Sequence, residues 1–379
     1  MISKVLARFH KSNRKFGTAI PRNYDEALLF DTTNGNHLWR DAIELEMTNV
    51  KIAFKFLHEG APPPPGYTPI KCFIIFDVKM DLTRKARFVA GVHLTNPPTS
   101  MTYASVVSRE SVRIAFLLAA LNDLQILSGD IGNAYLNAPT TERIYYRAGN
   151  EWGPTIKGRV LVITRALYGL KTSAHAWRTH FCNTIQNKMK FKFSHADNDV
   201  WYKQDVKPNG TVYYSYILVY TDDILIISHA PKHYMDQLES SYYVKQKSIK
   251  FPDIYLGSRV KKVNDRSGHT AYATSSNDYV TEAIKIVESR MKDLHLSFTK
   301  SAKSPTGPFS NIKYKPELDV TNFCSAEEHQ LYHQAIGILR WMIEIGRIDI
   351  TVEVSLLSRY LSQPRTGHLV ELLHIFSFL

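Results

Sequence analysis

The sequence predicts an α+β protein of two or three domains. Its 379 residues are too many for one ordinary domain. Two pairs of strand-like apolar runs, within residues 72–94 and 212–228, have the pattern of β-hairpins, and stretches with helical spacing lie between them. From about residue 261 onward the chain is more helical and more basic. Antiparallel hairpins combined with helices in this way are typical of the α+β class.

Hydrophobic spacing and capping residues predict where each element lies. One helix begins near Trp39 and repeats apolar residues at steps of three or four as far as Phe54. Ser108 is a suitable N-cap for the next helix. The predicted helices cover residues 39–54, 109–121, 173–189, 279–291, 326–345 and 367–379. The predicted strands cover residues 72–78, 85–94, 125–128, 144–146, 160–163, 212–219 and 224–227.

The charge balance predicts a polyanionic partner. Lys and Arg number 47 against 35 Asp and Glu, which gives a formal net charge of +12. Cations that contact phosphates release condensed counterions, but charge alone does not separate nucleic acid from an anionic membrane surface. The hydrophobic share of 44% argues against disorder. No apolar run reaches the roughly 18 residues of a spanning helix and no signal-peptide core opens the chain, so no membrane partner is expected.

The cysteines indicate a reducing compartment and no disulfide framework. Cys72, Cys182 and Cys324 are widely spaced and form no paired pattern. Cys324 is followed by His329 and His333, which share one helical face, but a fourth ligand at a suitable spacing is missing. We therefore expect a structural role for this trio.

The clearest local signal is a pair of aspartates between two strands of buried type. Asp222 and Asp223 separate the strands predicted at 212–219 and 224–227. Asp is a good turn former, but a two-residue hairpin more often contains Asn-Gly or Asp-Gly. Adjacent carboxylates repel each other and stabilise nothing unless a cation lies between them. The segment therefore predicts a metal site, with a plain turn as the alternative.

The first hairpin contains several cations near its turn, namely Arg84, Lys85 and Arg87. They could simply solvate an exposed hairpin. They could also clamp a phosphate, because a guanidinium group forks onto phosphate oxygens with paired hydrogen bonds. The residues alone leave both interpretations open.

A series of motifs follows along the chain in a fixed order. They are the basic hairpin, Asp130 in Asp-Ile-Gly-Asn-Ala-Tyr, Leu-Tyr-Gly-Leu-Lys at 167–171 ahead of Trp177, Tyr-Thr-Asp-Asp at 220–223, and Tyr-Leu-Gly at 255–257. Together they resemble the reverse transcriptase of copia-type LTR retrotransposons (Pseudoviridae), the polymerase part of the Pol polyprotein. The likeness covers nearly the whole chain. Any single motif is moderately specific, whereas all of them in this order are highly specific.

The resemblance implies a right-hand polymerase fold with fingers, a ferredoxin-like palm and a thumb, followed by the start of a connection region. In this interpretation residues 1–36 form a tail or linker, and residues 37–260 hold the fingers hairpin at 71–95 and the palm at 105–140 and 200–260. Residues 261–345 would be a thumb-like helical region, and residues 346–379 the start of the connection, truncated before ribonuclease H. The last helix stays strongly apolar to its end, which predicts an exposed face that a continuing chain would cover.

The resemblance also implies the chemistry. Asp130, Asp222 and Asp223 would be the catalytic carboxylates and would bind two Mg²⁺ ions, for which Mn²⁺ could substitute. The implied reaction is RNA-directed DNA synthesis, a phosphoryl transfer that requires mainly positioning and charge neutralisation. The implied partners are an RNA template, a DNA primer or product and deoxynucleoside triphosphates, with ribonuclease H and integrase in the native polyprotein. The expected location is intracellular, in cytoplasmic virus-like particles or in the nucleus.

Further residues receive substrate roles from the same resemblance. Triphosphate contacts are assigned to Arg84, Lys85 and Arg87, and Lys171 is assigned to substrate binding. Primer contacts are assigned to Tyr255, Leu256 and Gly257. Tyr135 would press against the sugar and exclude a 2′-hydroxyl, so that deoxynucleotides are selected by shape.

The chain departs from its close relatives after Lys171. Those relatives have Gln and then Pro-Arg where this chain has the run 172–175, which puts nucleotide affinity or fidelity in question. Thr221 replaces the more familiar Val or Met, with little effect expected. Two alternatives stay open: a decayed remnant that only binds nucleic acid, and an RNA-templated RNA polymerase, which Tyr135 disfavours.

Overall fold

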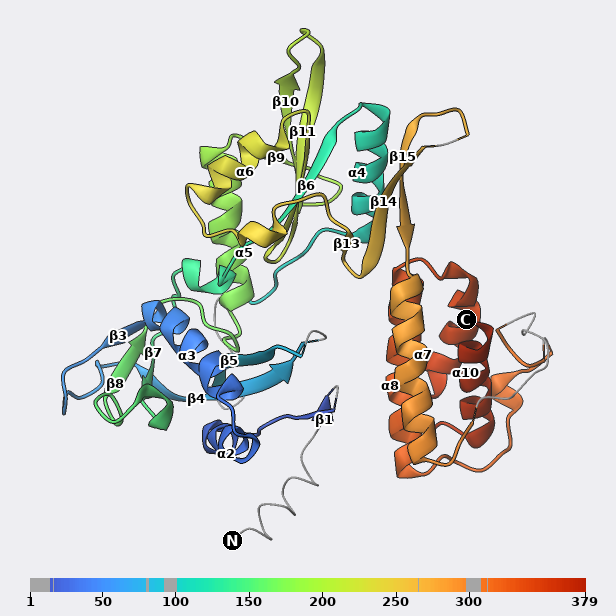
Figure 1. Ribbon diagram of the computed structural model, residues 1–379, viewed down its shortest axis with the longest axis horizontal. Coiled ribbons are helices and arrows are strands. Elements are labelled where there is room, and N and C mark those ends of the chain that lie inside the picture. The colour runs from blue at the N-terminus through green and yellow to red at the C-terminus, as the bar shows by residue number, and fades with distance from the viewer. Residues whose placement is uncertain are drawn as a thin grey trace. The chain divides into compact units, whose positions relative to one another are not determined.

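A computed structural model describes residues 14–15, 17–79, 82–91, 101–264, 266–297, 308–311 and 313–379. The chain divides into two compact units, one made of Met1–Ser108 and Leu127–Lys250, the other of Arg109–Ile126 and Phe251–Leu379. Sheets and helices occur in both units (Figure 1), which confirms the predicted α+β class. The assignment of fingers, palm and thumb to these parts stays a prediction.

The first unit contains a five-stranded sheet of order β3-β8-β7-β4-β5, in which β4 runs parallel to β7 and the other neighbours are antiparallel. Its strands are β3 (Phe54–Phe56), β4 (Thr68–Val78), β5 (Arg84–Gly91), β7 (Ile144–Arg147) and β8 (Val160–Ile163). Helix α3 (Leu38–Val50) lies across β5 (Figure 1). Phe54, predicted at the end of this helix, instead begins β3, because its ring packs in the sheet core against Phe88 and Trp152.

A second five-stranded sheet in this unit has the order β6-β12-β11-β10-β9. Its strands are β6 (Gln125–Asp130), β9 (Lys192–Phe193), β10 (Val200–Val206), β11 (Val212–Tyr220) and β12 (Asp223–Ser228). Helices α5 (Ser173–Asn183) and α6 (Pro231–Glu239) share one buried core with this sheet, to which Trp177, Phe181, Ile217 and Leu238 belong. A π-helical turn, Thr184–Lys188, continues α5.

The second unit combines a small sheet with a helical bundle. The sheet has the order β13-β14-β15, with strands β13 (Ile254–Tyr255), β14 (Ser258–Asn264) and β15 (Thr270–Ser275). The helices are α4 (Arg109–Leu121), α7 (Asn277–Asp293), α8 (Ala326–Glu344), α9 (Thr351–Leu357) and α10 (Thr366–Phe378). Helices α7, α8 and α10 lie side by side (Figure 1) around one apolar core.

Helix α4 was predicted within the palm segment 105–140, but it packs in the second unit. It contacts β15, where the ring of Phe116 lies 5.9 Å from that of Tyr272. The hydroxyl of Tyr272 also donates to the carbonyl oxygen of Leu124 at 3.5 Å. The continuous palm segment is therefore split, because the apolar face of α4 is buried by a strand that follows much later in the sequence.

Residues predicted as a tail or linker contain an ordered helix, α2 (Tyr24–Asn34). Asn23 caps it, since its side-chain oxygen accepts the backbone N–H of Glu26 at 2.9 Å. Phe30 is buried, and the carboxylate of Asp31 accepts the N–H of Trp39 at the start of α3 at 3.1 Å. The helix escaped prediction because it buries too few residues to produce a clear period. Before it, β1 (Arg14–Lys15) pairs with β2 (Thr18–Ala19).

The apolar helix α10 is packed within the chain. It buries Leu369, Leu372, Ile375 and Phe376 and contacts both α8 and α9. This packing accounts for its apolar composition, so the prediction of an exposed apolar face is wrong. In the part of the chain that the structure describes, no helix is both long and apolar enough to cross a membrane. The predicted end of the first hairpin, residues 92–95, lies outside the described residues.

Candidate active site

Neighbouring strands bring the three predicted carboxylates together. Asp130 is the last residue of β6, Asp223 is the first residue of β12, and Asp222 lies in the turn before it. Strands β6 and β12 are adjacent in the sheet. The backbone N–H of Ile131 donates to the carbonyl oxygen of Asp222 at 2.8 Å, which ties the two strand ends directly. Residues far apart in the sequence therefore meet at one edge.

Negative charge accumulates at this edge. Burial raises the pKa of Asp222, and the charge of Asp130 raises it further. Burial, Asp222 and Asp130 together raise the pKa of Asp223 to about 6. Asp222 and Asp223 thus resist ionisation beside a further carboxylate, and a cation placed between these groups would stabilise them.

Lys245 is the cation that contacts this cluster. Its ammonium group donates to both carboxylate oxygens of Asp130, at 2.8 and 2.7 Å. Two further hydrogen bonds hold the two segments together. The backbone N–H of Lys245 donates to the carbonyl oxygen of Asp130 at 3.0 Å, and the backbone N–H of Asp130 donates to Ser248 Oγ at 2.8 Å. The sequence alone did not predict Lys245, because no local motif marks it. Its role depends on the folded chain bringing its segment close to the end of β6.

The donor set suits a hard divalent cation, because carboxylate oxygens are the ligands that Mg²⁺ prefers. Among the described residues, no group of three or more His, Cys, Asp or Glu side chains is arranged to hold a metal ion as it stands. Both oxygens of Asp130 are bonded to Lys245. A metal ion bound by Asp130 would therefore compete with Lys245 for this carboxylate.

Two of the predicted hairpin cations face the carboxylates. The Arg87 guanidinium lies 4.7 Å from the centre of the Tyr168 ring, and its charge acts on the carboxyl of Asp222. Burial lowers the pKa of Lys85, and neighbouring cations, Arg87 and Lys245 among them, lower it further, while Asp222 acts in the opposite direction. Positive charge is therefore in excess on this face of the hairpin.

Arg84 lies on the other face of the hairpin. Its guanidinium stands over the ring of Trp39, 5.4 Å from the ring centre, and donates to the carbonyl oxygen of Leu82 at 2.6 Å. Side chains along a strand point alternately to opposite faces, so Arg84 is separated from Lys85 and Arg87. The structure does not bring together all three predicted triphosphate contacts.

The Leu-Tyr-Gly-Leu-Lys segment, residues 167–171, packs against β5. The N–H of Ala90 donates to the carbonyl oxygen of Tyr168 at 2.7 Å. A Cβ atom at Gly169 would lie 2.2 Å from the carbonyl oxygen of Ala90, and φ there is +92°, so this approach requires glycine. Lys171, at the end of the segment, is half-buried.

Thr172 and Ser173, which differ from the residues of the relatives, form hydrogen bonds at the end of this segment. Thr172 and Ser173 are buried. The Thr172 hydroxyl donates to the Glu142 carboxylate, and the Ser173 hydroxyl donates to the carbonyl oxygen of Leu167 at 2.7 Å. Both hydroxyl groups therefore hold the loop in place.

Tyr135 lies beside the same loop. It belongs to a short 3₁₀ helix, Ala134–Asn137, and its ring is 4.8 Å from that of Tyr168. Burial raises the pKa of Tyr135, and the negative charge of Asp222 raises it further. The ring is thus close enough to the carboxylates for them to affect its ionisation, while its contact with a sugar stays a prediction.

The predicted primer contacts lie in the second unit. Leu256 and Gly257 form the turn between β13 and β14, with φ of +47° and +84°. Tyr255 is buried and pairs with Ser258. Trp341 covers the turn, since its indole nitrogen would lie 3.3 Å from a Cβ at Gly257. Their role toward a primer stays a prediction.

The His329 and His333 side chains have the structural role that was expected. The Nε2 atom of each lies 2.7 Å from the carbonyl oxygen of Leu361. They therefore tie α8 to the segment that follows α9. The backbone N–H of Cys324 donates to the carbonyl oxygen of Pro364 at 3.0 Å.

Comparison with known proteins identifies the family of the chain. The family profile described as reverse transcriptase (RNA-dependent DNA polymerase) matches residues 63–291, more than half of the chain. The chain therefore belongs to the reverse transcriptase family. Its relatives come from transposons and confirm the copia-type resemblance.

The relatives differ in how much of them the chain covers. The retrovirus-related Pol polyprotein from transposon RE1 of Arabidopsis thaliana is 26% identical over all of this chain and 25% of its own length. The Pol polyprotein from transposon TNT 1-94 of Nicotiana tabacum is 24% identical over 80% of this chain and 22% of its own. A transposon Ty5-1 protein of Saccharomyces cerevisiae is 27% identical over 66% of this chain and 74% of its own. The chain thus spans about a quarter of the Pol polyproteins it matches.

Proposed function

We propose that the chain is an RNA-directed DNA polymerase of a copia-type retrotransposon, which extends a DNA primer with deoxynucleoside triphosphates. One observation carries the proposal: opposite charges in excess face each other within the first unit. Burial raises the pKa of Asp222 and Asp223, and neighbouring carboxylates add to this rise; burial lowers the pKa of Lys85, and neighbouring cations add to this fall. A triphosphate bound with divalent cations would bring further opposite charge to both groups.

The residues then have distinct tasks. Asp130, Asp222 and Asp223 would hold two Mg²⁺ ions, which when bound supply activation of the primer hydroxyl and neutralisation of the pyrophosphate. Lys85 and Arg87 attract and orient the triphosphate through charge-assisted hydrogen bonds. The Tyr135 ring, held against Tyr168, limits the space beside the sugar.

The nucleic acid partners follow from charge and family. A formal net charge of +12 suits a template–primer duplex, whose affinity rests on many phosphate contacts. The relatives are retrovirus-related Pol polyproteins. We extend the proposal to an RNA template and to a polyprotein that also carries ribonuclease H and integrase.

Primer extension on poly(rA)/oligo(dT) with Mg²⁺ or Mn²⁺ tests the proposal. Asp222→Asn should abolish extension and leave the Kd for the template–primer within a few fold, because binding rests on distributed contacts. Asp236→Asn is the matched control, since Asp236 lies on α6 of the same unit and pairs with Lys232. It should extend primers like the wild type.

Two outcomes would overturn the proposal. If Asp222→Asn extends primers at a rate near that of the wild type, the carboxylates do not carry the chemistry. If the wild type binds the duplex but extends nothing with either metal, the chain is the nucleic-acid-binding remnant. Extension with ribonucleotides in preference to deoxynucleotides would instead identify an RNA polymerase.

A further inference from the structure

Trp177 on α5 forms a hydrogen bond to the turn that carries the candidate catalytic carboxylates. Its indole Nε1–H donates to the carbonyl oxygen of Thr221 at 2.7 Å, in the turn that carries Asp222. The indole is 1% exposed, stacks on Phe181 at 5.0 Å and meets the edge of Tyr242 at 5.5 Å. A ring confined on these sides is a fixed donor.

The acceptor residue has a strained backbone. Thr221 has φ of +58°, a left-handed conformation that a β-branched side chain rarely adopts. Such a conformation persists only where the surroundings hold it in place. Two successive carbonyl groups are held here, that of Thr221 by Trp177 and that of Asp222 by the N–H of Ile131 at 2.8 Å. These bonds fix the peptides on both sides of Asp222.

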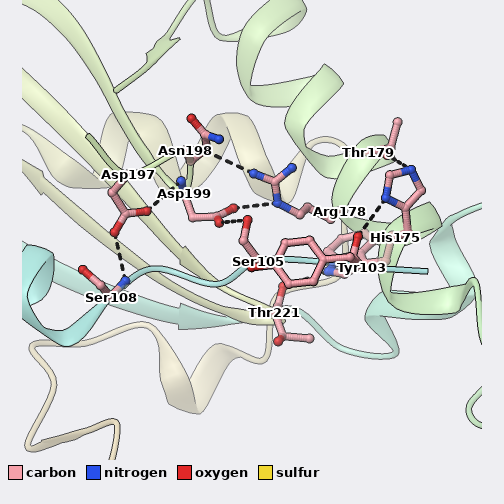
Figure 2. A network of polar contacts seen from close by, with 11 residues as sticks. Tyr103, Ser105, Ser108, His175, Arg178, Thr179, Asp197, Asn198, Asp199 and Thr221 are labelled. Atoms are coloured by element: carbon pink, nitrogen blue, oxygen red, sulfur yellow. Dashed lines mark hydrogen bonds and ion pairs between the residues drawn. The ribbon is translucent and has the colours of Figure 1, made fainter. Parts of the chain in front are cut away.

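The helix that carries Trp177 is itself anchored to the same sheet by the next residue, as Figure 2 shows. Arg178 Nε donates to the carboxylate of Asp199 at 2.9 Å, and Asp199 is 1% exposed. The Ser105 hydroxyl donates to the other oxygen of this carboxylate, and the N–H of Val219 donates to the carbonyl oxygen of Asp199 at 3.0 Å. The anchor fixes α5 relative to β11, and so sets the position of the indole relative to the turn.

A second tryptophan in the same core shows that packing alone does not require an indole hydrogen bond. Trp201 on β10 is 2% exposed, and among the described residues its Nε1–H has no hydrogen-bond partner. Trp201 and Trp177 belong to one apolar cluster. The bond from Trp177 to Thr221 is therefore separable from the packing of the ring.

We propose that Trp177 is a positioning residue for the carboxylates: its indole N–H fixes the strained Thr221 peptide and thereby orients Asp222 and Asp223 to bind divalent cations. The inference rests on the proposed polymerase function for its kinetic consequence. Its direct consequence, the affinity for a divalent cation, can be measured without any turnover.

The test compares Trp177→Phe with Trp201→Phe. Both remove a buried indole from one core, but only the first removes a bond to the turn. We expect Trp177→Phe to lower kcat and to weaken Mn²⁺ binding, followed by the EPR signal of free Mn²⁺, each by about tenfold, the factor for one lost hydrogen bond of ordinary strength. The KM for the template–primer should stay within a few fold, and Trp201→Phe should match the wild type in kcat and Mn²⁺ affinity.

Equal kcat and equal Mn²⁺ affinity in the two variants would overturn the proposal. Urea unfolding measures how much stability each variant loses. If Trp177→Phe does not fold, a tryptophan analogue with sulfur in place of the ring N–H is placed at position 177, because it keeps the packing of the ring and removes the hydrogen bond. The two failures are distinguishable. Active Asp222→Asn refutes the polymerase chemistry, whereas inactive Asp222→Asn with normal Trp177→Phe refutes the positioning role alone. Mn²⁺ affinity decides the positioning even if the wild type extends no primer.

Discussion

Replacing Asp223 with asparagine should stabilise the metal-free protein at neutral pH. The folded state raises the pKa of this carboxyl from 3.8 to about 6, through burial and the charges of Asp222 and Asp130. The folded protein therefore binds the proton more tightly than the unfolded chain does. The stability that this protonation contributes is fully present below pH 3.8 and is lost as the pH rises through about 6. Above that pH the ionised carboxylate destabilises the fold, and Asp223→Asn removes it.

The size of the gain follows from the shift. A difference of about two pKa units corresponds to at most about 3 kcal/mol. Burial of Asp223 is incomplete and part of its surface stays in contact with solvent, which screens the repulsion, so we discount the figure to about 1 kcal/mol. The free energy of unfolding of Asp223→Asn should thus exceed that of the wild type by this amount near pH 8, and the difference should vanish near pH 4.

Urea unfolding in EDTA across this pH range measures the difference. Asp77→Asn is a control of opposite sign, because a hydrogen bond from Lys15 lowers the pKa of Asp77. This variant should lose stability at neutral pH, and the loss should disappear as the pH falls through the lowered pKa. Added Mn²⁺ should stabilise the wild type more than Asp223→Asn, because binding to the folded state adds stability. Equal stability near pH 8, or a gain that grows on acidification, would refute the electrostatic account.

Three further predictions concern substrates. Arg87→Ala should raise the KM for deoxynucleotides at least about fivefold, because it removes a charge-assisted hydrogen bond to the triphosphate. Arg84→Ala should leave this KM unchanged and lower the stability of the protein, since Arg84 packs on Trp39. Equal KM values for the two variants would contradict the separation of the two faces. Tyr135→Val should raise the kcat/KM ratio of ribonucleotides to deoxynucleotides at least about tenfold, and an unchanged ratio would make Tyr135 a core residue. The logarithm of the template–primer binding constant should fall linearly with the logarithm of the salt concentration, with a slope of about −0.9 per neutralised phosphate. An affinity that does not change with salt would show that the +12 charge serves only to solvate the surface.

Local periodicity predicted the elements whose own sequence decides their structure. The helix at 109–121 and the strand at 160–163 have the predicted bounds, because a full apolar face or a continuous apolar run is visible without tertiary context. Predictions failed where distant contacts decide. Phe54 joined a strand because it packs against Trp152, and the apolar face of α10 is buried by α8 and α9.

The candidate site divides in the same way. The adjacent pair Asp222 and Asp223 was visible as a candidate metal site in the local sequence, whereas Asp130 was predicted only through the family resemblance. Lys245 and the bond from Trp177 could not be predicted, since each depends on one segment approaching another. The position of Arg84 could have been predicted from the sequence. Side chains alternate along a strand, so Arg84 lies on the face opposite Lys85 and Arg87, which the grouping of the three cations did not take into account.

The turn at 221–223 concentrates two features that oppose stability, the left-handed backbone of Thr221 and the mutual repulsion of the carboxylates. Neither feature helps a protein that only holds nucleic acid, because phosphate contacts need cations and tolerate a relaxed turn. Both features suit divalent cation binding, which relieves the repulsion and requires carboxylates in fixed orientations. Asp223→Asn and Trp177→Phe should therefore change stability in opposite directions and yet weaken Mn²⁺ binding alike. That combination distinguishes a turn organised for metal chemistry from one that is merely poorly packed.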